Sequence, residues 1–229
     1  MDRVKLIQLL MKQKGLTNYL EIGVFNGHVF FKIKSKFKIA VDPEFAFDFL
    51  RKTGKILSNP YNLFNKYYSK TSDDFFKQDA PGLFEQKKVQ LAFIDGMHEY
   101  AFALRDVENT LDYLTDDGVI ILHDCNPETE NANGSFEEWK KSGYIGTWNG
   151  DVWRTILHLR SLRNDINVFV LDCDHGLGVV TRGKPENKLN FTLQQINQFA
   201  YKDFDANRNQ WINLKPADYA YQYFNLKYQ

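Results

Sequence analysis

The chain has 229 residues, the size of one domain. Its 29 basic residues balance 29 acidic ones, so nucleic acid is not expected as a partner, because phosphate binding needs a basic surplus. No stretch approaches the roughly 20 apolar residues of a membrane span, and no secretory signal pattern opens the chain. These features predict a cytoplasmic protein with no membrane partner, and Cys125 and Cys173 are expected to be reduced thiols.

Apolar periodicity predicts alternating helices and strands through residue 124. The strands are continuous apolar runs, which is typical of a parallel sheet covered on both faces. The predicted strands are residues 19–24, 38–41, 66–69, 89–94 and 119–122. The predicted helices are residues 2–14, a helix opening over 28–34, one through Phe75 and Phe76 capped by Thr71 or Ser72, and 100–114.

The second half of the sequence carries a different pattern. Residues 128–150 are polar and aromatic and are expected to be an insertion, followed by a helix over 152–162. Residues 167–172 and 177–181 predict an antiparallel hairpin at the sheet edge, and the tail from residue 192 is expected to be partly helical. The prediction is therefore a single α/β domain over residues 1–229, with a doubly wound, mostly parallel seven-stranded sheet of Rossmann-like type.

Unusual residues stand at the ends of the first two strands, where open α/β sheets bind ligands. The first strand runs into Glu21-Ile22-Gly23-Val24-Phe25-Asn26-Gly27, in which Gly23 permits a tight turn and Gly27 a close approach. An acidic residue before the glycines suits a cationic amino-acid group better than a phosphate. Asp42 ends the second strand, where a carboxylate can accept both ribose hydroxyls.

These patterns resemble class I S-adenosylmethionine (SAM)-dependent methyltransferases. Glu-x-Gly-x-x-x-Gly followed by Val-Asp-Pro is similar to their first two motifs. The stretch Phe93-Ile94-Asp95-Gly96-Met97-His98-Glu99-Tyr100 and the later His123-Asp124 resemble the small-molecule and sugar O-methyltransferase branch, the methyltransferase domain 24 type. The resemblance covers residues 17–125. The sequence departs from the common pattern at Phe25, where a third glycine often stands, and at His28.

The resemblance implies a role for each strand end. Glu21 and Gly23 would contact the methionine end of SAM, Asp42 the ribose, and Ser72 or Asp73 the adenine. Gly27 and Asp95 are also expected among the cofactor-binding residues. The resemblance implies a SAM-dependent enzyme that methylates a hydroxyl of a small molecule, with a sugar as one candidate. A homodimer is one candidate assembly, because aromatic residues after residue 130 also suit a dimer interface.

Asp95 and Asp124 end the fourth and fifth strands, which are expected to be neighbours. Two such carboxylates suit Mg²⁺, a hard ion that prefers oxygen ligands and would lower the pKa of a substrate hydroxyl. His98 follows Asp95 by three residues and could remove the hydroxyl proton near neutral pH. His123 or Asn126 could complete the site. Metal dependence stays open, because many relatives need no metal.

Structural interpretations compete with these functional ones. Asp95 and Asp124 could be turn or capping residues, and His98 a structural loop histidine. Asp172, Asp174 and His175 are interpreted as turn residues beside Gly176 rather than a second metal site. Trp153 and Arg154 could bind substrate or simply pack. Five aromatic residues suit either a wall over a flat acceptor or packing: Phe136, Trp139, Tyr144, Trp148 and Trp153.

Two other functions compete with methyl transfer. A hydroxylase on the same scaffold would need an iron site built from His98, His123 and a carboxylate. A non-catalytic SAM-binding protein would bind the cofactor without turnover. A dehydrogenase is disfavoured because the Gly-x-Gly-x-x-Gly fingerprint is absent.

Overall fold

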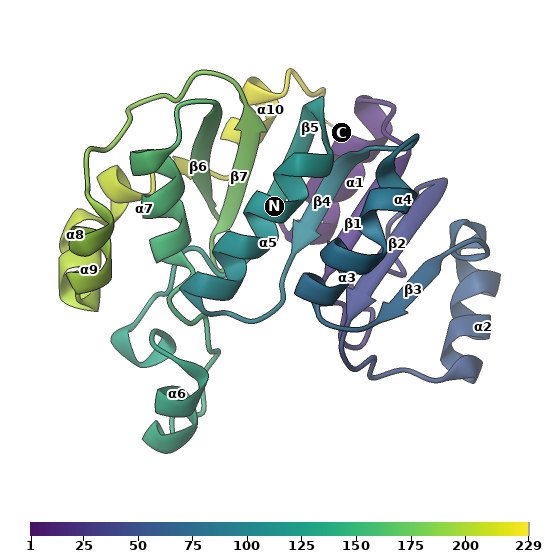
Figure 1. Ribbon diagram of the computed structural model, residues 1–229, viewed down its shortest axis with the longest axis horizontal. Coiled ribbons are helices and arrows are strands. Elements are labelled where there is room, and N and C mark those ends of the chain that lie inside the picture. The colour runs from purple at the N-terminus through teal and green to yellow at the C-terminus, as the bar shows by residue number, and fades with distance from the viewer. Residues whose placement is uncertain (229) are drawn as a thin grey trace.

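One eight-stranded sheet organises the computed structural model, which describes residues 1–228 (Figure 1). The strand order is β3-β2-β1-β4-β5-β7-β6-β8, and every pairing is parallel except those of β7. The strands are β1 (Asn18–Ile22), β2 (Phe37–Asp42), β3 (Lys66–Ser69), β4 (Val89–Ile94), β5 (Leu114–Leu122), β6 (Ile166–Asp172), β7 (Leu177–Arg182) and β8 (Leu214–Pro216). The predicted fold class is confirmed.

Helices cover both faces of the sheet, as the continuous apolar strands predicted. Residues of α3, α4, α5 and α7 pack on one face, and α1 and α10 pack on the other (Figure 1). The helices are α1 (Arg3–Gln13), α2 (Phe49–Ser58), η1 (Pro60–Asn62), α3 (Ser72–Gln78), α4 (Ala80–Phe84), α5 (Tyr100–Tyr113), η2 (Glu130–Ala132), α6 (Phe136–Ser142), α7 (Trp153–Leu162), α8 (Leu193–Gln198), α9 (Tyr201–Trp211) and α10 (Tyr219–Tyr223).

The helix predicted to open over residues 28–34 is wrong, because this segment forms successive turns. Its backbone carbonyls are taken by side chains from elsewhere in the chain. The buried ammonium of Lys38 donates to the carbonyls of Phe30 and Ile33, at 2.7 and 3.0 Å. The amides of Asn59 and Asn62 both donate to the carbonyl of Phe31, each at 3.0 Å. These distant donors stabilise the turns without a helical hydrogen-bond ladder.

The last part of the sheet extends further than the sequence indicated. The hairpin of β6 and β7 is antiparallel as expected, and the three-residue strand β8 pairs with β6 outside it. Strand β5 begins at Leu114 rather than at residue 119, with an irregularity opposite the start of β4. Within residues 1–228, no helix is both long and apolar enough to cross a membrane.

Candidate active site

A large cavity of about 1570 Å³ opens at the carboxyl ends of the parallel strands. This is where an open α/β sheet places its ligands. The sequence-predicted site residues that line the cavity are Glu21, Gly23, Asp42, Ser72, Asp73, Asp95, His98, His123 and Asp124. Gly27 does not line it. A side chain at Gly27 would meet the ring of Phe31, so this glycine serves the packing of the loop.

The loop after β1 is shaped by Gly23 and Asp42. Gly23 has φ +79°, and a Cβ there would lie 2.0 Å from the backbone oxygen of Asp95. Phe25, which departs from the resembled motif, also has a positive φ of 45°. The carboxylate of Asp42 accepts the backbone N–H of Phe25 at 2.7 Å and that of Glu44 at 2.8 Å. The hydrogen bond to Asp42 therefore stabilises the backbone of Phe25 in its left-handed conformation.

Glu21 lies buried at the floor of the cavity. The hydroxyl of Tyr19 donates to its Oε2 at 2.5 Å. Burial raises the pKa of Glu21 to about 8, although the hydrogen bond from Tyr19 and the charge of Lys38 oppose the shift. The carboxyl is thus poised to lose its proton when a cationic group approaches.

Ser72 and Asp73 reach the cavity from the first turn of α3, whose N-cap is Thr71. Asp73 also pairs with Arg105 at 3.0 Å on the surface. Behind them, Asp106 of α5 is buried and lines the same cavity. Burial raises the pKa of Asp106 to about 7, against the hydrogen bond from Ser72.

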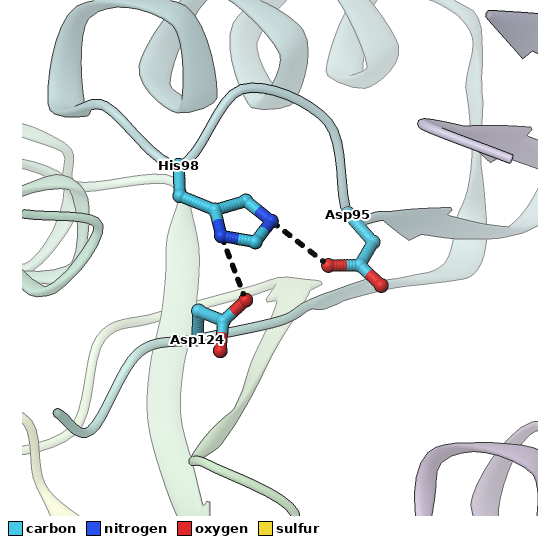
Figure 2. Close-up of side chains that lie close together, drawn as sticks. All are labelled: Asp95, His98 and Asp124. Atoms are coloured by element: carbon cyan, nitrogen blue, oxygen red, sulfur yellow. Dashed lines mark ion pairs between the residues drawn. The ribbon is translucent and has the colours of Figure 1, made fainter. Parts of the chain in front are cut away.

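His98 lies between Asp95 and Asp124 (Figure 2). Strands β4 and β5 pair with Ile94 opposite Leu122, so the carboxylates that follow them emerge at the same edge. His98 Nε2 is 3.3 Å from Asp95 Oδ1, and its Nδ1 is 3.2 Å from Asp124 Oδ2. The predicted neighbourhood of the three residues is therefore observed.

The surroundings of His98 raise the pKa of its imidazole and fix the orientation of the ring. Burial alone would lower its pKa, but the hydrogen bond to Asp95 and the charges of Asp124 and Asp95 outweigh burial and raise the pKa above its ordinary 6.5. The backbone carbonyl of Trp148 lies 3.0 Å from Nδ1, and the Trp148 indole stacks on the ring at 5.0 Å between centroids. His98 is thus fixed in orientation and holds a proton more firmly than a free histidine.

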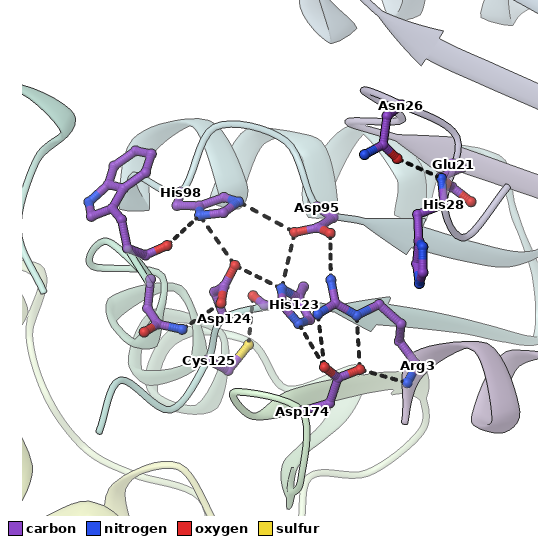
Figure 3. Close-up of polar contacts among 12 residues, drawn as sticks. Arg3, Glu21, Asn26, His28, Asp95, His98, His123, Asp124, Cys125 and Asp174 are labelled. Atoms are coloured by element: carbon purple, nitrogen blue, oxygen red, sulfur yellow. Dashed lines mark hydrogen bonds and ion pairs between the residues drawn. The ribbon is translucent and has the colours of Figure 1, made fainter. Parts of the chain in front are cut away.

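A chain of charged groups continues from this triad toward the N-terminal helix (Figure 3). His123 Nδ1 lies 2.7 Å from Asp124 Oδ2 and 3.1 Å from Asp95 Oδ1. Arg3 of α1 contacts Asp95 Oδ2 at 2.9 Å and clamps Asp174 with two guanidinium nitrogens, each at 2.8 Å. Although burial lowers the pKa of His123, the charge of Asp95 and the hydrogen bond to Asp124 raise it well above 6.5.

Asp95, His98 and Asp124 could also share a metal ion. One ligand atom from each lies within 4.8 Å of the others. His123 stands beside this group, on the far side of both carboxylates from His98 (Figure 3). Asn126 lies elsewhere: its side-chain oxygen accepts from Arg208 and it does not line the cavity.

The predicted aromatic wall is partly at the cavity. Phe136, Trp139 and Trp148 line it, whereas Tyr144 does not and Trp153 is fully buried against Phe204. Arg154, the other candidate substrate contact, donates to the carbonyls of Ile196 and Phe199. Its role is to tie α7 to the C-terminal tail.

Comparison with known families identifies the fold around this cavity. Residues 20–125 match the family model described as a methyltransferase domain. Over these residues the chain matches a methyltransferase domain. The match includes the loop after β1 and the two strand ends that carry Asp95 and Asp124, so the resemblance found in the sequence is confirmed.

Solved structures share the fold of this methyltransferase at low identity. An O-methyltransferase of tomaymycin synthesis from Streptomyces achromogenes, in complex with SAM, has 14% identity and a TM-score of 0.58, with 79% of each chain covered. An O-methyltransferase from Bacillus cereus bound to S-adenosylhomocysteine (SAH) has 17% identity and a TM-score of 0.55, with 78% of each chain covered. A TDP-rhamnose 3′-O-methyltransferase of calicheamicin biosynthesis has 11% identity and a TM-score of 0.50, with 79% of each chain covered. No curated protein sequence matches the chain significantly.

Three polar residues of the methyltransferase site escaped the sequence interpretation. No sequence pattern marked Arg3 as a site residue, because an arginine in the first turn of a helix is normally exposed to solvent. Asn149 donates to Asp124 Oδ1 at 2.5 Å from within the insertion. Asp174 was interpreted only as a turn residue, and that is incomplete, since it lines the cavity and binds Arg3. The positive φ of Asp174, 49°, fits the predicted turn.

Proposed function

We propose that this protein transfers the methyl group of SAM to a hydroxyl oxygen of a small-molecule acceptor. The observation that carries the proposal is His98, set between two carboxylates on the wall of the cavity that also reaches Glu21 and Asp42. One end of this cavity offers a cofactor-binding loop, and the other offers a proton acceptor. Transfer to oxygen needs both within one enclosure.

The cofactor would be held by the strand-end residues that line the cavity. Glu21 suits the amino group of SAM, Asp42 its ribose, and Ser72 or Asp73 its adenine. Both oxygens of Asp42 already accept a backbone N–H, so a ribose hydroxyl would use the remaining lone pairs. The loop geometry and the ribose site would then depend on the same carboxylate.

When bound, SAM supplies a methyl group activated by its positively charged sulfur. His98 would accept the hydroxyl proton while the acceptor oxygen forms its bond to the methyl carbon and the carbon–sulfur bond breaks. Asp95 and Asp124 would stabilise the imidazolium that results. The stacked Trp148 holds the ring so that the base does not turn away.

The acceptor would lie against Phe136, Trp139 and Trp148, which bring flat apolar surfaces to the cavity. A sugar fits this wall, because its C–H faces pack on aromatic rings while its hydroxyls reach polar groups. The insertion over residues 128–150 provides all three rings, so we assign acceptor choice to it and treat it as part of the same domain.

Titration calorimetry with SAM and with SAH tests the cofactor assignment. We expect both to bind, and we expect the affinity to rise between pH 6 and 7.5. With a pKa of about 8, Glu21 must lose its proton to pair with the amino group, which costs about tenfold in affinity per pH unit below that value. Glu21→Gln should flatten this dependence. Failure of both ligands to bind would exclude the assignment.

We infer that the transfer needs no divalent metal. The four oxygens of Asp95 and Asp124 already face N–H groups of Arg3, His98, His123 and Asn149. Arg3 and His123, whose pKa is raised well above 6.5, place positive charge beside the carboxylates of Asp95, Asp124 and Asp174. Mg²⁺ prefers neutral or anionic oxygen ligands, and here it would meet like charge instead.

Chelation and one substitution test this inference together. Activity should survive dialysis against EDTA, and calorimetry with Mg²⁺ should show no binding to the wild type. Arg3→Met leaves Asp95 and Asp174 without their cation, so this variant should acquire Mg²⁺ affinity. Loss of activity with EDTA that Mg²⁺ restores would contradict the inference.

A further inference from the structure

Exposed apolar side chains concentrate in one short segment, beside the β3 edge of the sheet. Within residues 1–228, fourteen large hydrophobic side chains are exposed, and six of them fall within residues 49–64. They are Phe49, Leu50, Leu57, Tyr61, Leu63 and Phe64. Such side chains are unremarkable when scattered singly, but a concentration of them marks an interaction surface.

Helix α2 turns its apolar side outward. Phe49, Leu50 and Leu57 lie on one side of the helix, since seven residues make about two turns. They are 78%, 77% and 82% exposed, and α2 has no buried residue. The basic side faces the protein instead: Lys52 lies over the ring of Tyr67, 4.3 Å from its centroid. Figure 1 shows α2 at the outer margin of the fold, beyond β3.

A cationic hollow follows η1 along the chain. The side-chain amide of Asn62 donates to the carbonyl of Lys55 at 3.0 Å, which fastens η1 to the last turn of α2. Phe64, 74% exposed, then lines a hollow together with Lys36, Lys66 and Lys87. No carboxylate lines this hollow. From residue 49 to residue 70 the sequence has five basic residues and no acidic one.

We propose that this surface, which we call the α2 face, docks on a lipid bilayer that carries anionic headgroups. The α2 face consists of Phe49, Leu50, Leu57, Leu63 and Phe64 with Lys36, Lys66 and Lys87. Its apolar side chains would enter the boundary between headgroups and acyl chains, and its lysines would pair with phosphates. The contact is peripheral, so it needs no spanning segment.

Charge and chemistry favour an anionic bilayer over two other candidate partners, a second copy of the chain and a nucleic acid. A two-fold dimer through the α2 face would bring the lysines of both copies into one interface, and the face itself has no carboxylate to pair with them. Nucleic acid would match the lysines, but the aliphatic Leu50, Leu57 and Leu63 offer nothing to bases or phosphates. An anionic bilayer offers an apolar boundary to the hydrophobic side chains of the α2 face and phosphates to its lysines. The sequence-based expectation of no membrane partner considered only spanning segments and net charge, and the α2 face is a local feature.

Vesicle flotation tests the proposal on the full-length protein. We expect binding to phosphatidylcholine vesicles that contain phosphatidylglycerol, little binding to pure phosphatidylcholine, and release by salt. The double variant Lys66→Gln/Lys87→Gln should bind about 25-fold more weakly, roughly fivefold for each lysine. Leu57→Ser/Phe64→Ser should lose more than about tenfold through lost apolar burial.

Matched controls come from outside the α2 face. Ile145→Ser removes an apolar side chain that is 99% exposed on the insertion, and Lys202→Gln removes an exposed lysine of α9. Both should bind vesicles like the wild type, and SAM affinity confirms that every variant folds. Absence of vesicle binding, or binding insensitive to the α2-face variants, would overturn the proposal. So would a dimer in light scattering that Leu57→Ser/Phe64→Ser dissociates, because the face would then join two copies.

Discussion

His98→Gln is expected to lower kcat by about 10²–10⁴-fold, the usual contribution of a positioned general base. The glutamine NH2 group can still donate to one of the two carboxylates, but the side chain cannot accept the hydroxyl proton. SAM affinity should stay unchanged, because the proposed cofactor contacts lie at the β1, β2 and α3 ends of the cavity. The measurement is SAH release with acceptors drawn from a panel of sugars and phenols, beside calorimetry with SAM.

The pH profile separates a base from a merely structural histidine. The pKa of His98 is raised above 6.5, so at lower pH the imidazole already holds a proton and cannot accept another. The rate should therefore rise as pH increases through that raised pKa, and this limb should vanish in His98→Gln. His158→Gln, outside the cavity beside Tyr100, is the matched control. Full turnover by His98→Gln would show that His98 is not the base.

Gly23→Ala is expected to remove SAM binding and to destabilise the fold by about 2–6 kcal/mol, from backbone strain and overpacking together. The new Cβ would lie 2.0 Å from the Asp95 backbone oxygen, at a residue whose φ is +79°. Strands β1 and β4 would have to separate at the point where the cavity begins. This cost is a large part of the roughly 5–15 kcal/mol that stabilises a typical domain. Thermal unfolding and SAM calorimetry measure the two effects.

Gly15→Ala is the control that isolates the clash. Gly15 has φ +66°, close to that of Gly23, but a Cβ there meets nothing within 4 Å. The Gly15→Ala variant should be destabilised only by the cost of the left-handed conformation, about 1–2 kcal/mol, and it should bind SAM normally. Equal destabilisation of both variants would mean that the contact with Asp95 relaxes freely.

Residues at strand ends were predictable from the sequence because sheet topology alone brings them together. Once β4 and β5 are recognised as buried parallel strands, Asp95 and Asp124 must emerge side by side. His98 lies near them because it follows Asp95 by three residues. The cofactor loop is predictable for the same reason, as Glu21 and Asp42 end adjacent strands. In these cases a local pattern and one general rule of the fold decide the position.

Long-range polar contacts were not predictable in the same way. Residues 28–34 are expected from the sequence to open a helix, but the structure forms turns there, and Lys38, Asn59 and Asn62 donate hydrogen bonds to their carbonyls. Arg3 reaches Asp95 across 92 residues of sequence, and no local pattern marks it. Partners of this kind depend on the completed tertiary structure, so a single sequence read for periodicity cannot show them.

The position of Arg3 has a practical consequence for handling the protein. Its guanidinium and its backbone N–H both bind Asp174, and Asp2 also lines the cavity. A purification tag fused ahead of Met1 would begin two residues from this clamp and would crowd the mouth of the cavity. Tags on the opposite terminus avoid the clamp, because the last helix lies on the α1 side of the sheet, where Lys227 bonds to Gln13 at the far end of α1. Preparations that retain an N-terminal tag are therefore poor material for judging how well this protein binds its ligands.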